Sequence, residues 1–414
     1  MAVHYHKSPD ACVACTTCTA YCPVAAHTQN YQGPKLTAPA GERFRLLGEP
    51  DDSSLSYCSN CKICDMSCPY NVPISVINMM ARADYCAKNP PPLRDWLVAH
   101  GELLANLTSI LPNFLRNWVM NSGFVRSILD FMGIAKEMPL PNFVAKTFKQ
   151  AYKNKLKSNK ADAVAAADIN KTLVYFPGCY VNIYEPQTGF DVVEVLKQAG
   201  YHVIVPDNFC CCGLPLVANG YMRAAKHNAV KNSAELDKWR NEGIPVLTSC
   251  PSCGLMLKRE YGELFPDIAG TEHNAKNIYD VCEFIGSLIE SGCWKGSFRT
   301  DAPISAIYHT PCHSRVQGCG KPGLQLALNL PNVSAIDADA GCCGMSGSYG
   351  FKKDKYSIAM NIGSSLFQTI DASGAQCVIT ECGICQLQIR HGISKKKEKR
   401  VMHPITLLKE RLIF

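Results

Sequence analysis

Two runs of cysteine establish the N-terminal part of the fold: CVACTTCTAYCP at residues 12–23 and CSNCKICDMSCP at residues 58–69. Both runs have the form C-x2-C-x2-C-x3-C-P, which is typical of [4Fe-4S] ligands in two-cluster ferredoxins. Three closely spaced thiolates bind one cluster, and the cysteine before proline binds the other. The runs therefore predict a first cluster on Cys12, Cys15, Cys18 and Cys68, and a second on Cys58, Cys61, Cys64 and Cys22.

The gap between the two runs indicates which kind of ferredoxin this is. Cys22 and Cys58 are separated by 35 residues, which is long for a compact β-hairpin ferredoxin. We therefore predict a helical ferredoxin over residues 1–92, in which residues 74–87 have the apolar spacing of a helix. A pair of zinc sites is the alternative, because eight thiolates could hold two zinc ions.

A different cysteine pattern occurs twice in the C-terminal half: a single cysteine, then an adjacent pair, then a C-x2-C pair. The corresponding cysteines of the two copies are 133, 131 and 132 residues apart. Its flanks also correspond, since FPGCY matches HTPCH, which indicates an internal duplication. Short β-rich runs such as TLVYF and QCVIT alternate with helical stretches, so we predict parallel α/β repeats over residues 166–298 and 299–414. The predicted ligands are Cys179, Cys211, Cys212, Cys250 and Cys253 in repeat 1, and Cys312, Cys342, Cys343, Cys382 and Cys385 in repeat 2.

Each repeat supplies five thiols, one more than a zinc ion or a simple cubane needs. Adjacent cysteines can bind neighbouring irons, so the pattern favours additional iron–sulfur clusters. Structural zinc and reversible disulfide chemistry are the alternatives. Cys210 extends the pair to a CCC run, in which Gly213 favours Cys211 and Cys212 as the ligands. His309 and His313 flank Cys312, and we expect packing or hydrogen bonding from both, since the thiols suffice.

Composition limits the class of protein. The chain has 414 residues, 24 cysteines, a net charge of +7 and 47% hydrophobic residues, so it can bury a core in each of several domains. The start, MAVHYHKSPD, lacks the apolar region of a signal peptide, and we expect metal-binding thiols in a reducing compartment. No run of 18 apolar residues occurs, so no transmembrane helix is predicted.

Residues 93–165 are predicted to form amphipathic basic helices and a linker. Residues 103–160 contain nine Lys or Arg and two Asp or Glu, a difference of +7 that equals the net charge of the chain. Apolar stripes beside basic residues can lie in a membrane interface. We therefore predict membrane contact through Leu104, Trp118, Phe124 and Phe131. The alternative is that these stripes cover the neighbouring domains.

No nucleotide or flavin fingerprint is convincing. GCGKPG at residues 318–323 fits G-x-G-x-x-G but does not directly follow a strand, and no P-loop occurs. We therefore predict no flavin, no NAD and no catalytic residue in this chain, with substrate oxidation on a partner protein. No basic patch is interleaved with aromatic residues, so we predict no binding of nucleic acid.

Longer motifs carry a family resemblance. GERFRL, YCSNCKICDMSCP, YHTPCH, GSYGFKK after CCG, and the terminal HPITLL resemble the family of iron–sulfur electron-transfer (C) subunits of anaerobic glycerol-3-phosphate dehydrogenases. The doubled cysteine pattern also resembles the cysteine-rich domains of the heterodisulfide reductase B subunit, and the glycolate oxidase iron–sulfur subunit is similar in domain order. The resemblance implies an α+β multidomain protein, with an all-helical dicluster ferredoxin before a duplicated α/β cysteine-rich domain.

The resemblance also implies a function. Members of this family carry electrons from flavoprotein dehydrogenase subunits toward menaquinone in anaerobic respiration, and are thought to anchor the complex. The expected place is therefore the cytoplasmic side of the inner membrane, as a peripheral protein that contacts the quinone pool. Two other functions are left open: the iron–sulfur subunit of a glycolate or other 2-hydroxy acid oxidase, and a disulfide reductase similar to heterodisulfide reductase.

Overall fold

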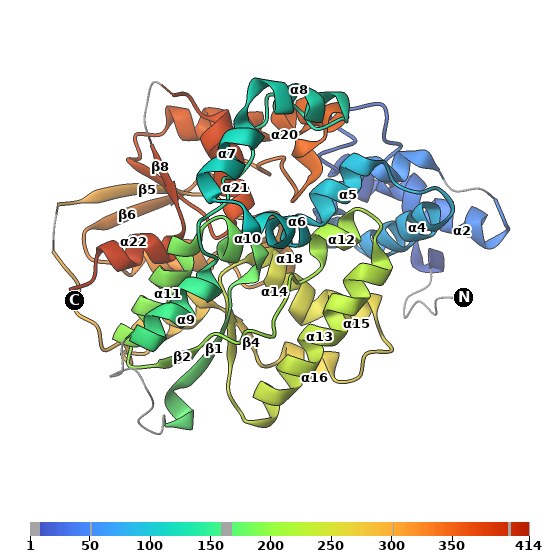
Figure 1. The fold of residues 1–414 in the computed structure, drawn as a ribbon. Helices are drawn as coiled ribbons and strands as arrows, with labels where there is room; N and C mark the ends of the chain where they lie inside the picture. The colour runs from blue at the N-terminus through green and yellow to red at the C-terminus, as the bar shows by residue number, and fades with distance from the viewer. Residues whose placement is uncertain (1–8, 50–51, 159–167, 301, 396–398, 414) are drawn as a thin grey trace.

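The computed structural model describes residues 9–49, 52–158, 168–300, 302–395 and 399–413. Figure 1 shows a helical N-terminal part, helices α5–α9 that cross the front of the molecule, and two α/β repeats. The predicted fold class is confirmed, since helices precede two small parallel sheets with their own helices.

The N-terminal part consists of short helices, with no strand among its described residues 9–49 and 52–92. Its helical elements are η1 (Pro9–Ala11), α1 (Thr17–Ala20), η2 (Leu36–Ala40), α2 (Gly41–Leu46), η3 (Ser53–Tyr57), α3 (Ile63–Ser67) and α4 (Ile74–Lys88). The helix predicted over residues 74–87 is α4, which buries Ile77 and Met79 against the rest of the chain. Most of the predicted cluster cysteines lie in the loops between these helices, whereas Cys18 lies in α1 and Cys64 in α3.

Several short helices follow Pro92, in the segment predicted to form amphipathic basic helices. They are α5 (Leu93–Ala99), α6 (Gly101–Leu107), η4 (Thr108–Ile110), α7 (Asn113–Asn121), α8 (Gly123–Phe131) and α9 (Phe148–Ser158). The polar, alanine-rich stretch KNKLKSNKADAVAAAD at residues 153–168 is the predicted linker, but its residues 153–158 are helical in α9. Residues 159–167 of that linker lie outside the described residues. None of the helices in the described ranges is long and apolar enough to span a bilayer.

The two repeats have sheets of the same topology. The strands of repeat 1 are β1 (Thr172–Phe176), β2 (His202–Ile204), β3 (Val246–Thr248) and β4 (Ile278–Asp280), in the order β2-β1-β3-β4. Those of repeat 2 are β5 (Ile304–Tyr308), β6 (Val333–Asp337), β7 (Cys377–Ile379) and β8 (Arg400–Met402), in the order β6-β5-β7-β8. All six strand pairs run parallel, as predicted. The sequence analysis missed β4 and β8, three-residue strands whose pairing depends on a distant partner.

Helices cover the sheets and bring the cysteine loops to one end of the strands. In repeat 1 they are α10 (Gly178–Ile183), α11 (Pro186–Gln198), α12 (Leu214–Ala218), α13 (Met222–Asn241), α14 (Pro251–Leu255), η7 (Met256–Glu260), α15 (Tyr261–Leu264), α16 (Thr271–Ala275) and α17 (Val281–Glu290), after η6 (Ile169–Lys171). In repeat 2 they are α18 (Cys312–Gln317), α19 (Pro322–Leu328), η8 (Tyr349–Phe351), α20 (Lys353–Ala372), α21 (Gly383–Gly392) and α22 (Pro404–Glu410). Each repeat therefore places its first cysteine after its first strand, at the carboxyl edge of the sheet.

One hydrophobic core is shared by the two repeats, in addition to a core on each repeat's own side. Tyr175 of β1 and Tyr308 of β5 belong to the same buried cluster, together with Ile405 and Leu408 of α22. Helix α22 packs on α11, where Asp191 accepts hydrogen bonds from Thr406 at 2.7 Å and Lys409 at 2.8 Å. This shared core holds the two cysteine sites at a fixed separation.

Candidate metal centres

The four thiols predicted for the first ferredoxin cluster lie together. Cys12, Cys15, Cys18 and Cys68 line one small cavity. Burial raises the pKa of the Cys18 thiol, and Cys12 and Cys68 raise it further. The backbone N–H of Val72 donates to Cys68 Sγ at 3.4 Å, which orients that sulfur. Cys68 comes from the second run, so the structure places the last cysteine of one run beside the first three of the other.

The second set of thiols is more deeply buried. Burial raises the pKa of Cys22 to about 11, and Cys58 contributes to the rise. Burial also raises the pKa of Cys64, as do its neighbours Cys61, Cys58 and Cys22. Asn78 Nδ2 donates to Cys58 Sγ at 3.8 Å. Because iron binds thiolates, cluster binding at these raised pKa values would release protons.

The same unusual backbone conformation presents the thiols of both runs. Ala14 and Thr16 have φ values of 60° and 65°, and Asn60 and Lys62, at the corresponding positions, have φ values of 56° and 62°. Left-handed conformations cost a non-glycine residue about 1–2 kcal/mol, and they persist at sites that require a particular geometry. The shared strain indicates that both loops are shaped to turn successive thiols toward one point.

The five thiols of repeat 1 form a continuous chain of contacts. Cys211 Sγ lies 3.7 Å from Cys179 Sγ. Cys211 also contacts Cys212, Cys212 contacts Cys253, and Cys253 contacts Cys250. Hydrogen bonding from its neighbours lowers the pKa of Cys211. The backbone N–H of Gly213 donates to Cys211 Sγ at 3.5 Å.

Repeat 2 reproduces this chain in the same order. Cys342 contacts Cys312 and Cys343, and Cys385 contacts Cys343 and Cys382. Cys343 Sγ and Cys385 Sγ are 3.2 Å apart. Gly344 N–H donates to Cys342 Sγ at 3.3 Å, as Gly213 does to Cys211 in repeat 1. The repeated order of contacts and the N–H donors aimed at sulfur fit an iron–sulfur cluster, whose potential such hydrogen bonds tune.

Cys210 lies outside the thiol chain of repeat 1. Its backbone N–H donates to Asn232 Oδ1 at 3.0 Å, and its Sγ lies 3.5 Å from the same oxygen. Burial raises the pKa of Cys210 to about 11. Of the CCC run, the structure therefore brings Cys211 and Cys212 to the other thiols and turns Cys210 toward α13.

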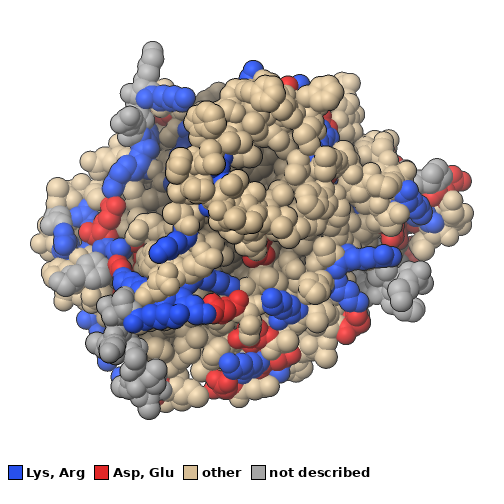
Figure 2. Space-filling model, in the orientation of Figure 1, with Lys and Arg blue, Asp and Glu red and all other residues tan. Residues whose placement is uncertain are grey.

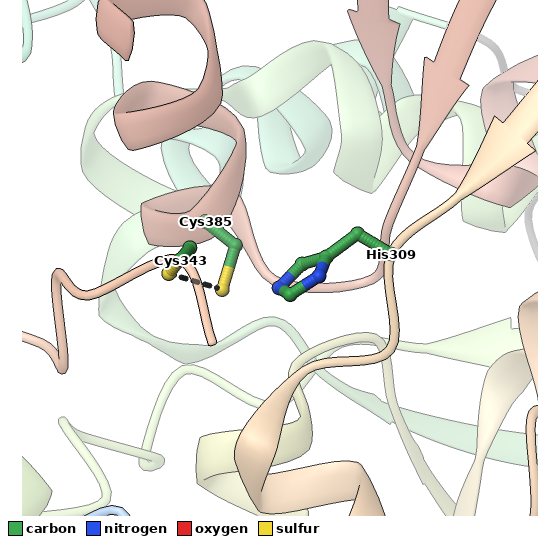
Figure 3. Close-up of side chains that lie close together, drawn as sticks. All are labelled: His309, Cys343 and Cys385. Atoms are coloured by element: carbon green, nitrogen blue, oxygen red, sulfur yellow. Dashed lines mark hydrogen bonds between the residues drawn. The ribbon is translucent and has the colours of Figure 1, made fainter. Parts of the chain in front are cut away.

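The two histidines beside Cys312 have different surroundings. His313 Nε2 donates to the backbone oxygen of Asn60 at 3.0 Å, and its Nδ1 accepts from Ser252 Oγ at 2.9 Å. His309 is buried, and its Nε2 has no hydrogen-bond partner among the described residues. Burial lowers the pKa of His309 to about 4, so its imidazole is neutral at physiological pH. Figure 3 shows its ring directed toward the sulfurs of Cys343 and Cys385.

The sites in the two repeats adjoin different parts of the chain. Cys342 packs with Cys22 and Cys58 of the ferredoxin, and the nearby thiol of Cys342 contributes to the raised pKa of Cys61, which burial dominates. In repeat 1, Glu102 of α6 accepts a hydrogen bond from the backbone N–H of Cys211 at 2.8 Å. Burial raises the pKa of Glu102. Sequence analysis missed Glu102, because a single acidic residue 109 positions before its partner leaves no local signal.

An apolar face lies over α6, η4, α7 and α8. Its exposed members are Leu103, Leu107, Ile110, Leu111, Phe114, Trp118, Val119, Phe124, Ile128 and Phe131. Phe131 is 92% exposed and Ile110 is 90% exposed, far more than is usual for large apolar side chains. Figure 2 shows this face as a broad region without charged side chains, bordered by Lys and Arg. Three of the four predicted membrane contacts, Trp118, Phe124 and Phe131, are exposed there, whereas Leu104 is half-buried.

Two of the basic residues in this segment are buried inside the protein and do not contribute to its surface charge. Arg116 and Arg126 are buried, and Arg126 Nη2 donates to the backbone oxygens of Ala135 at 3.0 Å and Lys136 at 2.7 Å. Phe148 and Tyr152 of α9 belong to the buried core of repeat 1. Helix α9 therefore covers the repeat, as the alternative interpretation expected, and only α6–α8 present an open apolar face.

Comparisons with known proteins identify the domains that contain these cysteines. A 4Fe-4S dicluster domain matches residues 8–72, and a cysteine-rich domain matches residues 173–258 and again 306–390. The chain is 34% identical to the C subunit of anaerobic glycerol-3-phosphate dehydrogenase of Escherichia coli, over 97% of this chain and 98% of that protein.

Relatives of lower identity match nearly the whole chain or about half of it. The B subunit of fumarate reductase (CoM/CoB) of Methanothermobacter marburgensis is 25% identical over 96% of this chain and 71% of its own length. Lactate utilization protein A of Bacillus subtilis is 26% identical over 57% of this chain and 98% of its own length. Because it is 34% identical to such a subunit along nearly its whole length, the chain belongs to the family of anaerobic glycerol-3-phosphate dehydrogenase C subunits.

Proposed function

We propose that this chain is the iron–sulfur subunit that connects a flavoprotein glycerol-3-phosphate dehydrogenase to menaquinone at the membrane surface. Its eight ferredoxin cysteines would hold two [4Fe-4S] clusters, and the ten repeat cysteines would hold further iron–sulfur clusters. When bound, such clusters supply one-electron transfer between donors and acceptors. The chain's own residues bind the clusters, bury them from water and orient their sulfur ligands.

The observation that carries the proposal is the position of the apolar face beside repeat 1. Leu103 and Leu107 lie on that face, and Glu102 of the same helix is bonded to the backbone of Cys211. One short helix therefore connects the thiols of repeat 1 to an exposed apolar surface. A quinone is an apolar molecule dissolved in lipid, so this is where a protein of this kind would meet it.

The same face supports peripheral docking on a membrane, which we place on the cytoplasmic side of the inner membrane. Burying an apolar side chain contributes about 1.5–3 kcal/mol, and each nearby Lys or Arg adds about 1 kcal/mol on an anionic surface. Lys136 and Lys146 are exposed in the loop that follows α8. These terms together favour attachment to anionic lipid without a membrane-spanning helix.

Vesicle flotation tests the docking. The intact chain should float with phosphatidylglycerol-containing vesicles, and the double variant Phe124→Glu/Phe131→Glu should lose at least about tenfold in bound fraction, since two apolar contacts are removed. A matched control is Leu46→Glu/Leu47→Glu, because these side chains are also exposed but lie at the end of α2, away from the apolar face. Equal loss in both variants, or no flotation of the intact chain alone or with its partners, would contradict docking by α6–α8.

The donor is tested with the reconstituted complex. Glycerol 3-phosphate should reduce the clusters of this chain only when the flavoprotein subunits are present, and a menaquinone analogue should reoxidise them faster on vesicles than in detergent-free solution. Reduction by glycolate or lactate with the corresponding flavoproteins, but not by glycerol 3-phosphate, would instead favour a 2-hydroxy acid oxidase. Turnover of a disulfide by the isolated chain would favour a disulfide reductase.

A further inference from the structure

Among the differences between the two repeats beside their equivalent thiols, one replaces a hydrocarbon side chain by a metal-binding one. Phe176 precedes Cys179 by three residues, and His309 precedes Cys312 by three residues. Phe176 is the last residue of β1, and His309 directly follows β5, so both side chains start from the same edge of equivalent sheets. Phe176 packs against the ring of Phe209 at 4.9 Å in an apolar cluster. Repeat 2 places a metal-binding side chain where repeat 1 has a hydrocarbon.

The surroundings of His309 fit a metal ligand better than a residue that only packs in the core. It is 2% exposed, and its Nε2 has no hydrogen-bond partner among the described residues. Leaving a buried polar group unpaired costs about 1–3 kcal/mol, which makes such groups rare in native proteins. Its backbone is fixed, because its N–H donates to Ile379 of the neighbouring strand at 3.0 Å. The unpaired nitrogen lies beside the thiols of repeat 2 and is therefore available to a partner other than the protein itself.

The geometry around His309 fits a metal ion. The ligand atoms of His309, Cys343 and Cys385 all lie within 4.8 Å of one another. Metal–nitrogen and metal–sulfur bonds of about 2.0–2.3 Å put tetrahedral ligands roughly 3.5–4 Å apart, so small side-chain movements bring the three atoms onto one ion. Figure 3 shows the imidazole and both sulfurs directed toward a common space. His313 offers no such donor, because both of its nitrogens are already bonded.

We propose that His309 Nε2 binds an iron of the cluster in repeat 2, next to Cys343 and Cys385, and that the cluster in repeat 1 has thiolate ligands only. The assignment rests on the iron–sulfur clusters proposed above for the repeats. The neutral imidazole donates its lone pair to iron and keeps its proton on Nδ1, so no proton is released by this ligand. An iron that takes neutral imidazole in place of an anionic thiolate has a higher potential, and we assign that difference to the iron bound by His309. The two repeat clusters would therefore have different potentials, with the higher one in repeat 2.

Pulsed electron paramagnetic resonance on the full chain, purified anaerobically with its clusters, tests the assignment. The signal of repeat 2 is identified as the one lost in Cys382→Ser. In the wild-type chain it should show the nitrogen coupling of a coordinated imidazole, and ¹⁵N-labelled histidine should change that coupling. The repeat 1 signal, identified by its loss in Cys250→Ser, should show no imidazole coupling. This measurement needs no substitution of His309 itself.

Two variants then identify the histidine. His309→Phe introduces the residue that repeat 1 has at this position, and it should abolish the coupling and lower the midpoint potential of the repeat 2 signal. His313→Gln is the matched control, because it also removes a buried histidine next to Cys312, and it should retain the coupling. Loss of the coupling in the His313 variant but not in the His309 variant would overturn the assignment.

Two further outcomes distinguish failure of the His309 assignment from failure of the proposed function. A repeat 2 signal without imidazole coupling in the wild-type chain overturns the assignment of His309 and leaves the iron content of the repeats intact. A chain whose iron is fully accounted for by the eight ferredoxin cysteines overturns both, because repeat 2 would then hold no iron for His309 to bind.

Discussion

The carboxylate of Glu102 accepts a hydrogen bond from the backbone N–H of Cys211 at 2.8 Å, across 109 residues of sequence. This contact attaches α6, and with it the apolar face, to the thiols of repeat 1. Both partners are largely shielded from water, since Cys211 is buried and burial raises the pKa of Glu102. This hydrogen bond therefore connects the cysteine site of repeat 1 directly to the helix that carries part of the proposed membrane-docking surface.

Two variants of Glu102 should distinguish the contribution of its hydrogen bond from that of its charge. Glu102→Ala leaves the N–H of Cys211 without an acceptor and should destabilise the chain by about 1–3 kcal/mol. Glu102→Gln keeps an acceptor oxygen and should stay close to wild type. Thermal unfolding of the cluster-loaded chain, with its iron content, measures both. Equal melting temperatures for the alanine and glutamine variants would contradict a structural role for this hydrogen bond.

The ion pair between Lys62 and Glu260 should stabilise the contact between the ferredoxin and repeat 1. Both side chains are fully buried, and Lys62 Nζ also donates to Ser75 Oγ at 3.2 Å. Glu260→Gln leaves the lysine charge buried without its counter-charge and should cost about 3–5 kcal/mol. The double variant Lys62→Met/Glu260→Gln should be less destabilised than the sum of the single variants. A double-mutant cycle by denaturant unfolding checks this, and additive effects would show that the pair is not coupled.

Gly344 should be required for the paired cysteines of repeat 2. It has a φ of 84°, and a Cβ at this position would overlap the backbone oxygen of Ala359 in α20. Gly344→Ala should displace Cys342 and Cys343 and remove the iron of repeat 2. Gly341→Ala is the matched control, because Gly341 has a φ of 80° but no atom within 4 Å of such a Cβ. The control should show only the conformational strain of about 1–2 kcal/mol. Iron analysis and the repeat 2 resonance signal distinguish the two, and equal iron loss would refute the steric explanation.

Asp280 should make stability depend on pH in a defined direction. Burial raises its pKa to about 6, although its side chain accepts N–H hydrogen bonds from Cys282 at 2.8 Å and Glu283 at 3.3 Å at the start of α17. In the unfolded chain the pKa of an aspartate is about 3.9. Between pH values of about 3.9 and 6 the folded state therefore binds more protons than the unfolded state. The free energy of unfolding falls by about 2–3 kcal/mol as the pH rises through 6. Asp280→Asn keeps the helix cap but cannot ionise.

The Asp280→Asn variant should therefore gain stability relative to wild type as the pH rises from 4.5 to 7.5. Parallel melting curves across this range measure the difference. The sign is decisive, because a variant that loses stability relative to wild type over the same range would mean that the folded state favours the ionised carboxylate.

Local spacing made much of the ferredoxin and the repeats predictable. The thiols of one C-x2-C-x2-C run are so close in sequence that their convergence depends on a few backbone angles, such as those of Thr16 and Lys62. The duplication was visible because Cys179 and Cys312 repeat with their neighbours, and a parallel α/β unit follows from strands that alternate with helices. The two histidines of HTPCH could not be told apart, because their surroundings come from Asn60, Ser252 and the β7 strand.

The amino-acid sequence alone was enough to establish the cysteine pattern, the order of the domains and the membership of the family, because ligand spacing and periodicity are local properties. The folded chain was needed to show that Cys210 turns away from its neighbours, that Arg116 and Arg126 are buried while Phe124 and Phe131 remain exposed, and that Phe148 and Tyr152 pack into repeat 1. The same holds for the contact between Cys342 and the ferredoxin thiols. These features arise from packing between segments far apart in the chain, where the free energy of burying one surface against another depends on shape and partners that no short stretch of sequence encodes.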